Sequence, residues 1–149
     1  MTLEKAIHAT TPLASKQKAV LNIMYSSRVV EDQVSDVLKE FGISKEQYNV
    51  LRILRGQKGK PANLCTIQER MIHRMSNTTR LVDKLIEKGL VQRSTCEENR
   101  RKVEIFITEK GMILLKQIDP LMENVNLKIL EAYTPEELEM LNKLLDKLQ

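Results

Sequence analysis

The sequence has no tryptophan, and aromatic residues make up only 3% of it. Without large aromatic side chains the core must be built from Leu, Ile, Val and Met, which favours packed helices. The five glycines argue against an architecture of many tight β-turns. With 149 residues and 42% hydrophobic content, the chain is long enough for one sizeable core. We therefore expect a mainly helical fold in a single domain over residues 1–149.

Cysteine and long apolar runs are scarce as well. Cys65 and Cys96 lie far apart without a CxxC spacing, and no signal-like apolar segment occurs near the N-terminus. The longest apolar runs, such as residues 112–115, fall far short of the roughly 20 residues of a membrane-spanning helix. These features predict a soluble protein in the reduced cytoplasm, with no membrane partner.

The motifs of common enzyme classes are also missing. There is no GxSxG, no P-loop, no GxGxxG after a strand and no HExxH. His73 follows Glu69 by four residues, but such a pair without a third ligand rarely holds a metal. We therefore expect no enzyme activity, no cofactor and no metal site.

Positive charge is concentrated in the middle of the chain. The net charge is +4 and the isoelectric point about 9.1. Residues 70–102 carry nine Lys and Arg against four Asp and Glu, whereas residues 103–149 carry five against nine. A local basic surface of this kind is typical of proteins that bind polyanions.

Hydrophobic spacing predicts one long helix over residues 15–40, with Gly42 just beyond as a stop. At about 1.5 Å per residue this helix would span nearly 40 Å, more than a compact domain of this size needs. Much of its apolar stripe must therefore be buried by another molecule. A second copy of the chain is the natural candidate.

Capping boxes predict the starts of three further helices. In a capping box a Ser or Thr hydroxyl accepts the N3 backbone N–H, and a Glu or Gln at N3 reaches back to the N-cap. The three predicted helices cover residues 44–54, 66–72 and 135–148. Their boxes are Ser44/Gln47, Thr66/Glu69 and Thr134/Glu137.

Another helix is predicted over residues 74–88, ended by Gly89, after which the period of the pattern changes. Residues 90–94 and the alternating residues 103–107 predict two strands, joined by the polar residues 95–101 as a β-hairpin with a charged tip. A long helix follows from Thr108 to about Tyr133, with a bend at Pro120. The expected order is four helices, a hairpin and two helices, a mainly α (α+β) fold. Six methionines are interpreted as core or pocket filling: Met24, Met71, Met75, Met112, Met122 and Met140.

Two short helices joined by a tight turn and followed by a basic-tipped hairpin are the parts of a winged helix-turn-helix. A helix about 12 Å wide fits the major groove of DNA and presents polar side chains from its first turns, while the hairpin reaches phosphate or the minor groove. We therefore expect double-stranded DNA as the partner. The expected contacts are Arg74, Ser76, Asn77, Thr78, Thr79, Arg80, Lys84, Asn99, Arg100, Arg101 and Lys102.

Each of these residues also has a structural alternative. Arg80 could form a surface ion pair with Asp83 or Glu87, which contributes under about 1 kcal/mol. Ser76 and Thr79 could cap and back-bond a helix, and the charge run at the hairpin tip could be a solvated loop.

Three segments carry a resemblance to a known family. They are MSNTTRLVDKLIEKGLVQR from Met75 to Arg93, ENRR from Glu98 to Arg101, and ITEKG from Ile107 to Gly111. Together they resemble the MarR (multiple antibiotic resistance regulator) family over nearly the whole chain.

The resemblance implies a winged helix-turn-helix lobe over residues 44–109, flanked by dimerisation helices over residues 12–40 and 110–149. Arg80 would be the recognition-helix arginine, and Arg101 the arginine of the hairpin, or wing. The family usually has Asp where Asn99 stands, and Asn cannot form an ion pair with the arginine two residues on. Arg74 stands where the family has a helix cap, and it is a poor N-cap.

By the same resemblance the protein is a homodimeric, ligand-responsive repressor that binds a pseudo-palindromic operator. A small phenolic or amphipathic effector would bind between the dimer arms and the DNA-binding lobe, with Tyr25 and Tyr48 as candidate lining residues. Relatives that sense oxidants make Cys65 and Cys96 candidate sensors, although neither has a clear low-pKa setting, which favours ordinary thiols. The alternative function is a protein-binding or dimerisation module that uses this fold without DNA.

Overall fold

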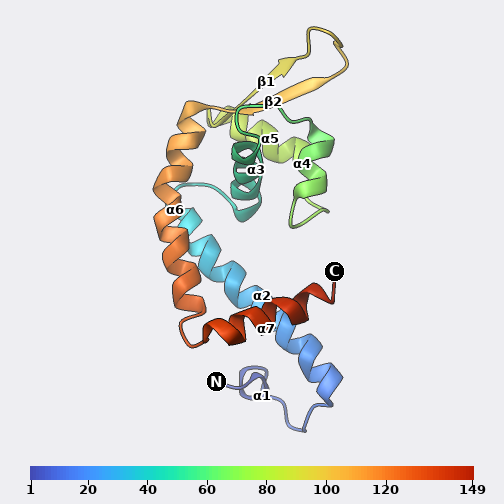
Figure 1. Ribbon diagram of the computed structural model, residues 1–149, viewed down its shortest axis with the longest axis vertical. Coiled ribbons are helices and arrows are strands. Elements are labelled where there is room, and N and C mark those ends of the chain that lie inside the picture. The colour runs from blue at the N-terminus through green and yellow to red at the C-terminus, as the bar shows by residue number, and fades with distance from the viewer.

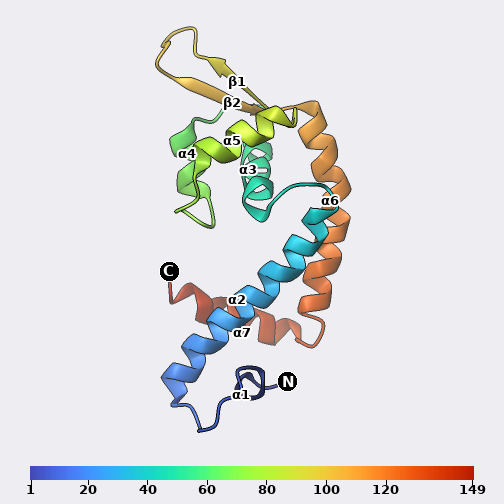
Figure 2. The same ribbon diagram turned by 180° about the vertical axis from the view of Figure 1, so that it is seen from behind.

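The computed structural model describes all residues 1–149 and contains seven helices and one two-stranded sheet (Figure 1). The predicted order and the mainly α fold are confirmed, and only the short α1 was not expected. The DNA-binding lobe predicted from the sequence lies at one end, and α7 lies at the other (Figure 2). The elements are α1 (Leu3–Ala6), α2 (Ser15–Lys39), α3 (Lys45–Gly56), α4 (Leu64–Arg70), α5 (Thr78–Glu87), β1 (Val91–Thr95), β2 (Val103–Ile107), α6 (Glu109–Ile129) and α7 (Pro135–Asp146).

One hydrophobic core joins the lobe to the long helices. It contains 17 buried residues and combines α3, α4, α5 and the hairpin base with the C-terminal end of α2 and the middle of α6. Each fully buried aliphatic side chain contributes about 1.5–3 kcal/mol. The lobe therefore shares its core with α2, which leads into it, and with α6, which leads out of it. The largest fully buried side chains are Leu38, Leu51, Leu54, Ile67, Leu85, Ile105, Leu115 and Ile118.

The base of the hairpin is anchored on both sides of β2. On one side β1 pairs antiparallel, with Val91 opposite Ile107. On the other side the Ile105 N–H donates to the Ala62 carbonyl at 2.8 Å, and the Ala62 N–H donates to the Ile105 carbonyl at 3.0 Å. The hairpin is thus fixed to the residues that lead into α4, while its tip extends beyond the lobe (Figure 1).

Two of the three predicted capping boxes are confirmed, at Ser44 of α3 and Thr134 of α7. The third, at Thr66, is wrong. Helix α4 begins at Leu64, and the Asn63 side chain accepts the Thr66 N–H at 2.7 Å. Asn is a strong N-cap, so the N-cap lies three residues earlier than predicted and Thr66 lies inside the first turn.

Helices α2 and α7 leave apolar side chains exposed. No residue of α7 is buried, and Leu38 is the one buried residue of α2. The large exposed apolar residues are Val20, Ile23, Met24 and Val30 of α2, Met140, Leu144 and Leu145 of α7, and Leu148 just beyond the end of α7. None of the helices has the length and continuous apolarity needed to cross a bilayer.

The interpretation of the methionines as core residues is confirmed for Met71 and Met122, which are buried. It is wrong within this chain for Met24, Met75 and Met140, which are 64%, 98% and 56% exposed. Their helical spacing or apolar character indicated burial, but no other element of the chain covers them.

Two charged contacts connect the lobe to the long helices. The Arg55 guanidinium of α3 donates to both carboxylate oxygens of Asp119 in α6, at 2.7 and 3.0 Å, and this raises the pKa of Arg55. Glu31 of α2 accepts a hydrogen bond from Lys45 of α3 and lies 3.4 Å from Nε2 of His73, which precedes α5. Both contacts orient the lobe relative to the helices that lead away from it.

Gly111 is packed too closely for any side chain. A Cβ here would lie 2.4 Å from the Leu90 carbonyl oxygen and 2.7 Å from Cγ1 of Ile107. We expect Gly111→Ala to lower the free energy of unfolding by about 1–3 kcal/mol, measured by urea unfolding, because the neighbouring backbone must shift. Gly56→Ala is the matched control. It has no atom within 4 Å of the new Cβ and should be neutral or stabilise by up to about 1 kcal/mol. Equal stability of the two variants would contradict this packing.

The Glu31 carboxylate contributes to stability only while it is ionised. The hydrogen bond from Lys45 lowers the pKa of Glu31 below its ordinary value of 4.5. A group with a depressed folded-state pKa stabilises above its unfolded pKa, and the contribution is lost as pH falls through the folded pKa. We expect Glu31→Gln to cost under about 1 kcal/mol at neutral pH, because the pair is partly exposed. In urea unfolding at a series of pH values, the difference from wild type should shrink below pH 4.5. A difference that stays constant in acid would rule this contribution out.

Candidate nucleic-acid interface

The helix-turn-helix consists of α4, the turn of residues 71–77 and α5. Hydrogen bonds hold the turn, one of them from Nε2 of Gln68 in α4 to the Arg74 carbonyl at 3.5 Å. The Ile72 N–H donates to Oδ1 of Asn49 in α3 at 2.9 Å, and the Ser76 N–H donates to the His73 carbonyl at 3.1 Å. The start of α5 is therefore held in place by α3 as well as by α4.

Helix α5 begins later than the predicted helix over residues 74–88. Its N-cap is Asn77, whose Oδ1 accepts the Arg80 N–H at 3.1 Å. Arg74 cannot cap a helix with its cationic side chain, whereas Asn is among the strongest N-caps. Residues 73–76 therefore form a turn, and the helix runs from Thr78.

Thr78 does not belong to the exposed surface. It is 5% exposed and lies on the inner face of α5 with Val82 and Leu85, and its Oγ1 has no hydrogen-bond partner. The expected DNA contact of Thr78 is therefore wrong, because the protein covers its hydroxyl. Ser76 is half-buried, and Thr79 is exposed.

Arg80 is exposed on the outer face of α5 and makes no ion pair. Its possible acidic partners are engaged elsewhere, since Asp83 pairs with Arg93 at 2.6 Å and Glu87 pairs with Lys84 at 3.1 Å. The Arg80 guanidinium thus keeps its donors free. The other predicted side chains exposed at this end of the lobe are Arg74, Asn77, Thr79 and Lys84.

The hairpin tip is closed by short-range hydrogen bonds. The Cys96 N–H donates to the Lys102 carbonyl at 3.0 Å, and the Lys102 N–H donates to the Asn99 carbonyl at 2.9 Å. Oδ1 of Asn99 accepts the backbone N–H of Arg101 at 3.1 Å. Asn99 therefore positions the backbone of Arg101 and leaves its guanidinium free. All four predicted tip residues, Asn99, Arg100, Arg101 and Lys102, are exposed and outside any ion pair.

The ion pair between Arg93 of β1 and Asp83 of α5 joins the hairpin to α5. Sequence reasoning missed it and considered Asp83 only as a partner of Arg80. The contact depends on the turn at Gly89, whose φ of 72° reverses the chain between α5 and β1. An exposed pair adds little stability, but this one connects the two elements that carry the free cations.

The comparisons with known proteins agree with this geometry. Residues 43–103 match the model of the MarR family. This segment is therefore similar to MarR family domains. It spans α3, α4, α5 and β1, and therefore the whole helix-turn-helix.

Solved structures extend the MarR likeness over most of the chain. A MarR transcription factor from Planctomyces limnophilus is 29% identical with a TM-score of 0.71, covering 91% of this chain and 98% of its own. Two others share the fold at lower identity. BpsR of Bordetella bronchiseptica, whose DNA binding is regulated by 6-hydroxynicotinic acid, is 18% identical with a TM-score of 0.80, and 93% and 97% of the two chains are covered. An organohalide-sensing transcriptional regulator with bound 2,4-dichlorophenol is 21% identical with a TM-score of 0.83, and 94% and 85% are covered.

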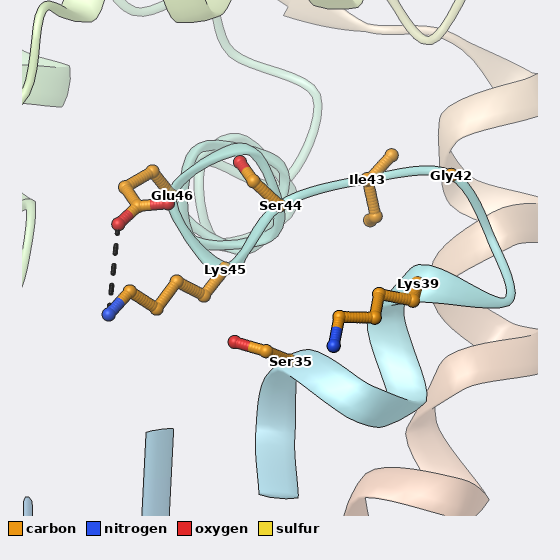
Figure 3. A pocket seen from close by; sticks show the side chains of 7 residues that line it. All are labelled: Ser35, Lys39, Gly42, Ile43, Ser44, Lys45 and Glu46. Atoms are coloured by element: carbon orange, nitrogen blue, oxygen red, sulfur yellow. Dashed lines mark ion pairs between the residues drawn. The ribbon is translucent and has the colours of Figure 1, made fainter. Parts of the chain in front are cut away.

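A pocket of about 420 Å³ lies where α2 meets α3 in this MarR fold. Figure 3 shows that Ser35 and Lys39 of α2 face the residues that begin α3. Ile43 is its one hydrophobic lining residue. The lining residues are Ser35, Lys39, Gly42, Ile43, Ser44, Lys45 and Glu46.

The two tyrosines predicted to line an effector site do not line this pocket. Tyr48 is 8% exposed in the hydrophobic core, and burial raises the pKa of its phenol. Tyr25 is half-buried on α2, where the Arg28 guanidinium lies 4.9 Å from its ring centroid. The structure thus places the two side chains in different settings.

Cys65 does not have the setting of a reactive thiolate. The exposed Cys65 thiol donates to Oε1 of Glu69 at 3.4 Å, and this hydrogen bond raises the pKa of Cys65. A raised pKa lowers the fraction of thiolate, the nucleophilic form. Cys96 is half-buried in the wing. His73 contacts Glu31 rather than Glu69, and no three His, Cys, Asp or Glu residues cluster as metal ligands.

The role of Asn77 as N-cap can be tested by its stability effect. Asn77→Ala should lower the free energy of unfolding by about 1 kcal/mol in urea, because the Arg80 N–H loses its acceptor. Asn77→Asp retains an acceptor and should remain close to wild type. Equal losses in both variants would argue against capping by this side chain.

Proposed function

We propose that this chain is a transcription regulator that binds duplex DNA with α5 in the major groove and the wing tip in the adjacent minor groove. The observation that supports it is the set of unpaired cations on two elements joined by the Arg93–Asp83 pair. Cations without acidic partners bind phosphates with little competition and release counterions from DNA. An exposed guanidinium at a recognition helix can also bond guanine O6 and N7.

The proposed contacts fall into two groups. On the helix side, Arg80 reads a base or binds phosphate, Thr79 and Ser76 offer hydroxyl groups, and Arg74 and Lys84 bind phosphates. Asn77 caps α5 and contributes through its remaining amide donors. On the wing, Arg101 enters the minor groove, held by Asn99 through its backbone, while Arg100 and Lys102 flank it.

Homodimerisation through α2, α6 and α7, within residues 12–40 and 110–149, is the second part of the proposal. Helix α7 has no buried residue although Met140, Leu144 and Leu145 form an exposed apolar stripe, and α2 exposes a similar one. Exposed apolar stripes on two helices are unfavourable in water and are typical of an interface between subunits. Two-fold symmetry would place two recognition helices on a pseudo-palindromic site, with half-sites about one helical turn apart.

We further propose that this chain is a repressor and that a small aromatic effector regulates its DNA binding. DNA binding by BpsR of Bordetella bronchiseptica is regulated by 6-hydroxynicotinic acid, and the organohalide-sensing relative binds 2,4-dichlorophenol. In this chain Arg55–Asp119 and Glu31–Lys45 connect the lobe to α6 and α2. A shift of the long helices would therefore change the separation of the two recognition helices and release the operator.

The double variant Arg80→Ala with Arg101→Ala tests DNA binding. We expect affinity for duplexes selected from a random pool to fall at least about tenfold, since each base or groove contact contributes about 1–3 kcal/mol. Fluorescence anisotropy at low salt measures affinity, and sedimentation should show that the dimer is kept. Lys116→Ala, which removes an exposed cation of α6, should bind like wild type.

Unchanged affinity of the double variant would reject this interface. If wild-type protein sedimented as a dimer but bound no duplex at low salt, the fold would serve as a protein-binding or dimerisation module instead.

A further inference from the structure

The turn that leads into α5 exposes two large apolar side chains, Ile72 and Met75. Met75 is 98% exposed, more than any other large hydrophobic residue of the chain. Burial of an apolar side chain in a partner is favourable in proportion to the area removed from water. A fully exposed Met at the entrance to a recognition helix is therefore available for contact with whatever that helix binds.

The backbone conformation of the turn explains why Met75 is exposed. The Ser76 N–H donates to the His73 carbonyl, which places Arg74 and Met75 at the two corner positions of a turn. Ile72, the residue before the turn, donates its backbone N–H to Asn49 of α3, and His73 lies against Glu31 of α2. With both ends of the turn held, the Met75 side chain extends from its corner into solvent.

The surroundings of Met75 favour a polyanion as its partner. Arg74 precedes it, Arg80 follows on the first turn of α5, and no Asp or Glu occurs between residues 70 and 82. Asn77, the N-cap of α5, is only two residues away. An apolar side chain within such a basic segment fits an apolar group on a nucleic acid. In the major groove that group is the C5-methyl of thymine.

We propose that Met75 recognises a thymine in each half-site through its C5-methyl group, an inference that rests on the proposed DNA-binding function. The flexible thioether side chain can adapt to the methyl group, and the contact removes both apolar surfaces from water. The polar side chains of α5 read hydrogen-bonding edges, whereas Met75 distinguishes thymine from bases that lack the methyl group.

The test replaces thymine by uracil, which removes only the methyl group. In a duplex bound by wild-type protein, each thymine is replaced singly and the affinity measured by fluorescence anisotropy. We expect one position per half-site at which the replacement weakens binding about fourfold, the effect of one buried methyl group. Met75→Gln, which has a similar length but a polar end, should bind the thymine and uracil duplexes equally. Met75→Leu keeps an apolar side chain and should retain the preference.

The controls separate this inference from the function on which it rests. Ile72→Ser should leave the thymine preference intact, and a preference lost only in Ile72→Ser would overturn the assignment to Met75. Three other results would also overturn the assignment to Met75. They are a thymine preference that survives in Met75→Gln, the absence of a thymine preference in wild type, and a change in the oligomeric state of Met75→Gln in sedimentation. Wild-type protein that binds no duplex would overturn the DNA-binding function itself.

Discussion

The core that the lobe shares with the long helices is the constraint on which the other features depend. Leu85 of α5 and Ile105 of β2 are fully buried in the same cluster as Leu38 of α2 and Leu115 of α6. Close packing transmits displacement, because a filled core cannot absorb a shift in one element without moving its neighbours. Helix α5, the base of the wing, the C-terminal end of α2 and the middle of α6 are therefore parts of one rigid unit.

That rigidity gives a role to contacts that add little stability. The Arg93–Asp83 pair is exposed, yet it lies between α5 and the hairpin, and the Arg55–Asp119 pair lies between α3 and α6. By occupying Asp83, Arg93 also leaves Arg80 without an acidic partner. Charge pairing within the lobe thus determines which cations remain free for phosphate or base contacts.

The two ends of the molecule differ in the kind of surface they expose. The lobe presents free cations on α5 and at the wing tip, whereas α2 and α7 present apolar stripes. Met75 is an exception, since it is an exposed apolar side chain at the basic end. Hydrophobic contact between subunits at one end and polyanion contact at the other are the two associations that these surfaces favour.

Local patterns in the sequence were enough to predict the elements, their order and most of their ends. The Ser44 and Thr134 capping boxes and the alternation in β2 involve hydrogen bonds or periodicity within a few residues, so they can be recognised without a fold. The exposed state of Arg80 and of the wing tip also followed from the charge pattern, since charged side chains are seldom buried.

Only the tertiary structure decided which side chains face the interior near the start of α5. Thr78 is buried and Met75 is exposed, the reverse of what their polarity predicts. The Asn77 cap and the contacts of the turn with Asn49 and Glu31 fix the backbone conformation before α5, and this determines which side chains face the interior. The pairing of Arg93 with Asp83 likewise required the reversal at Gly89. Burial and long-range pairing depend on neighbours distant in sequence, and a local pattern does not contain them.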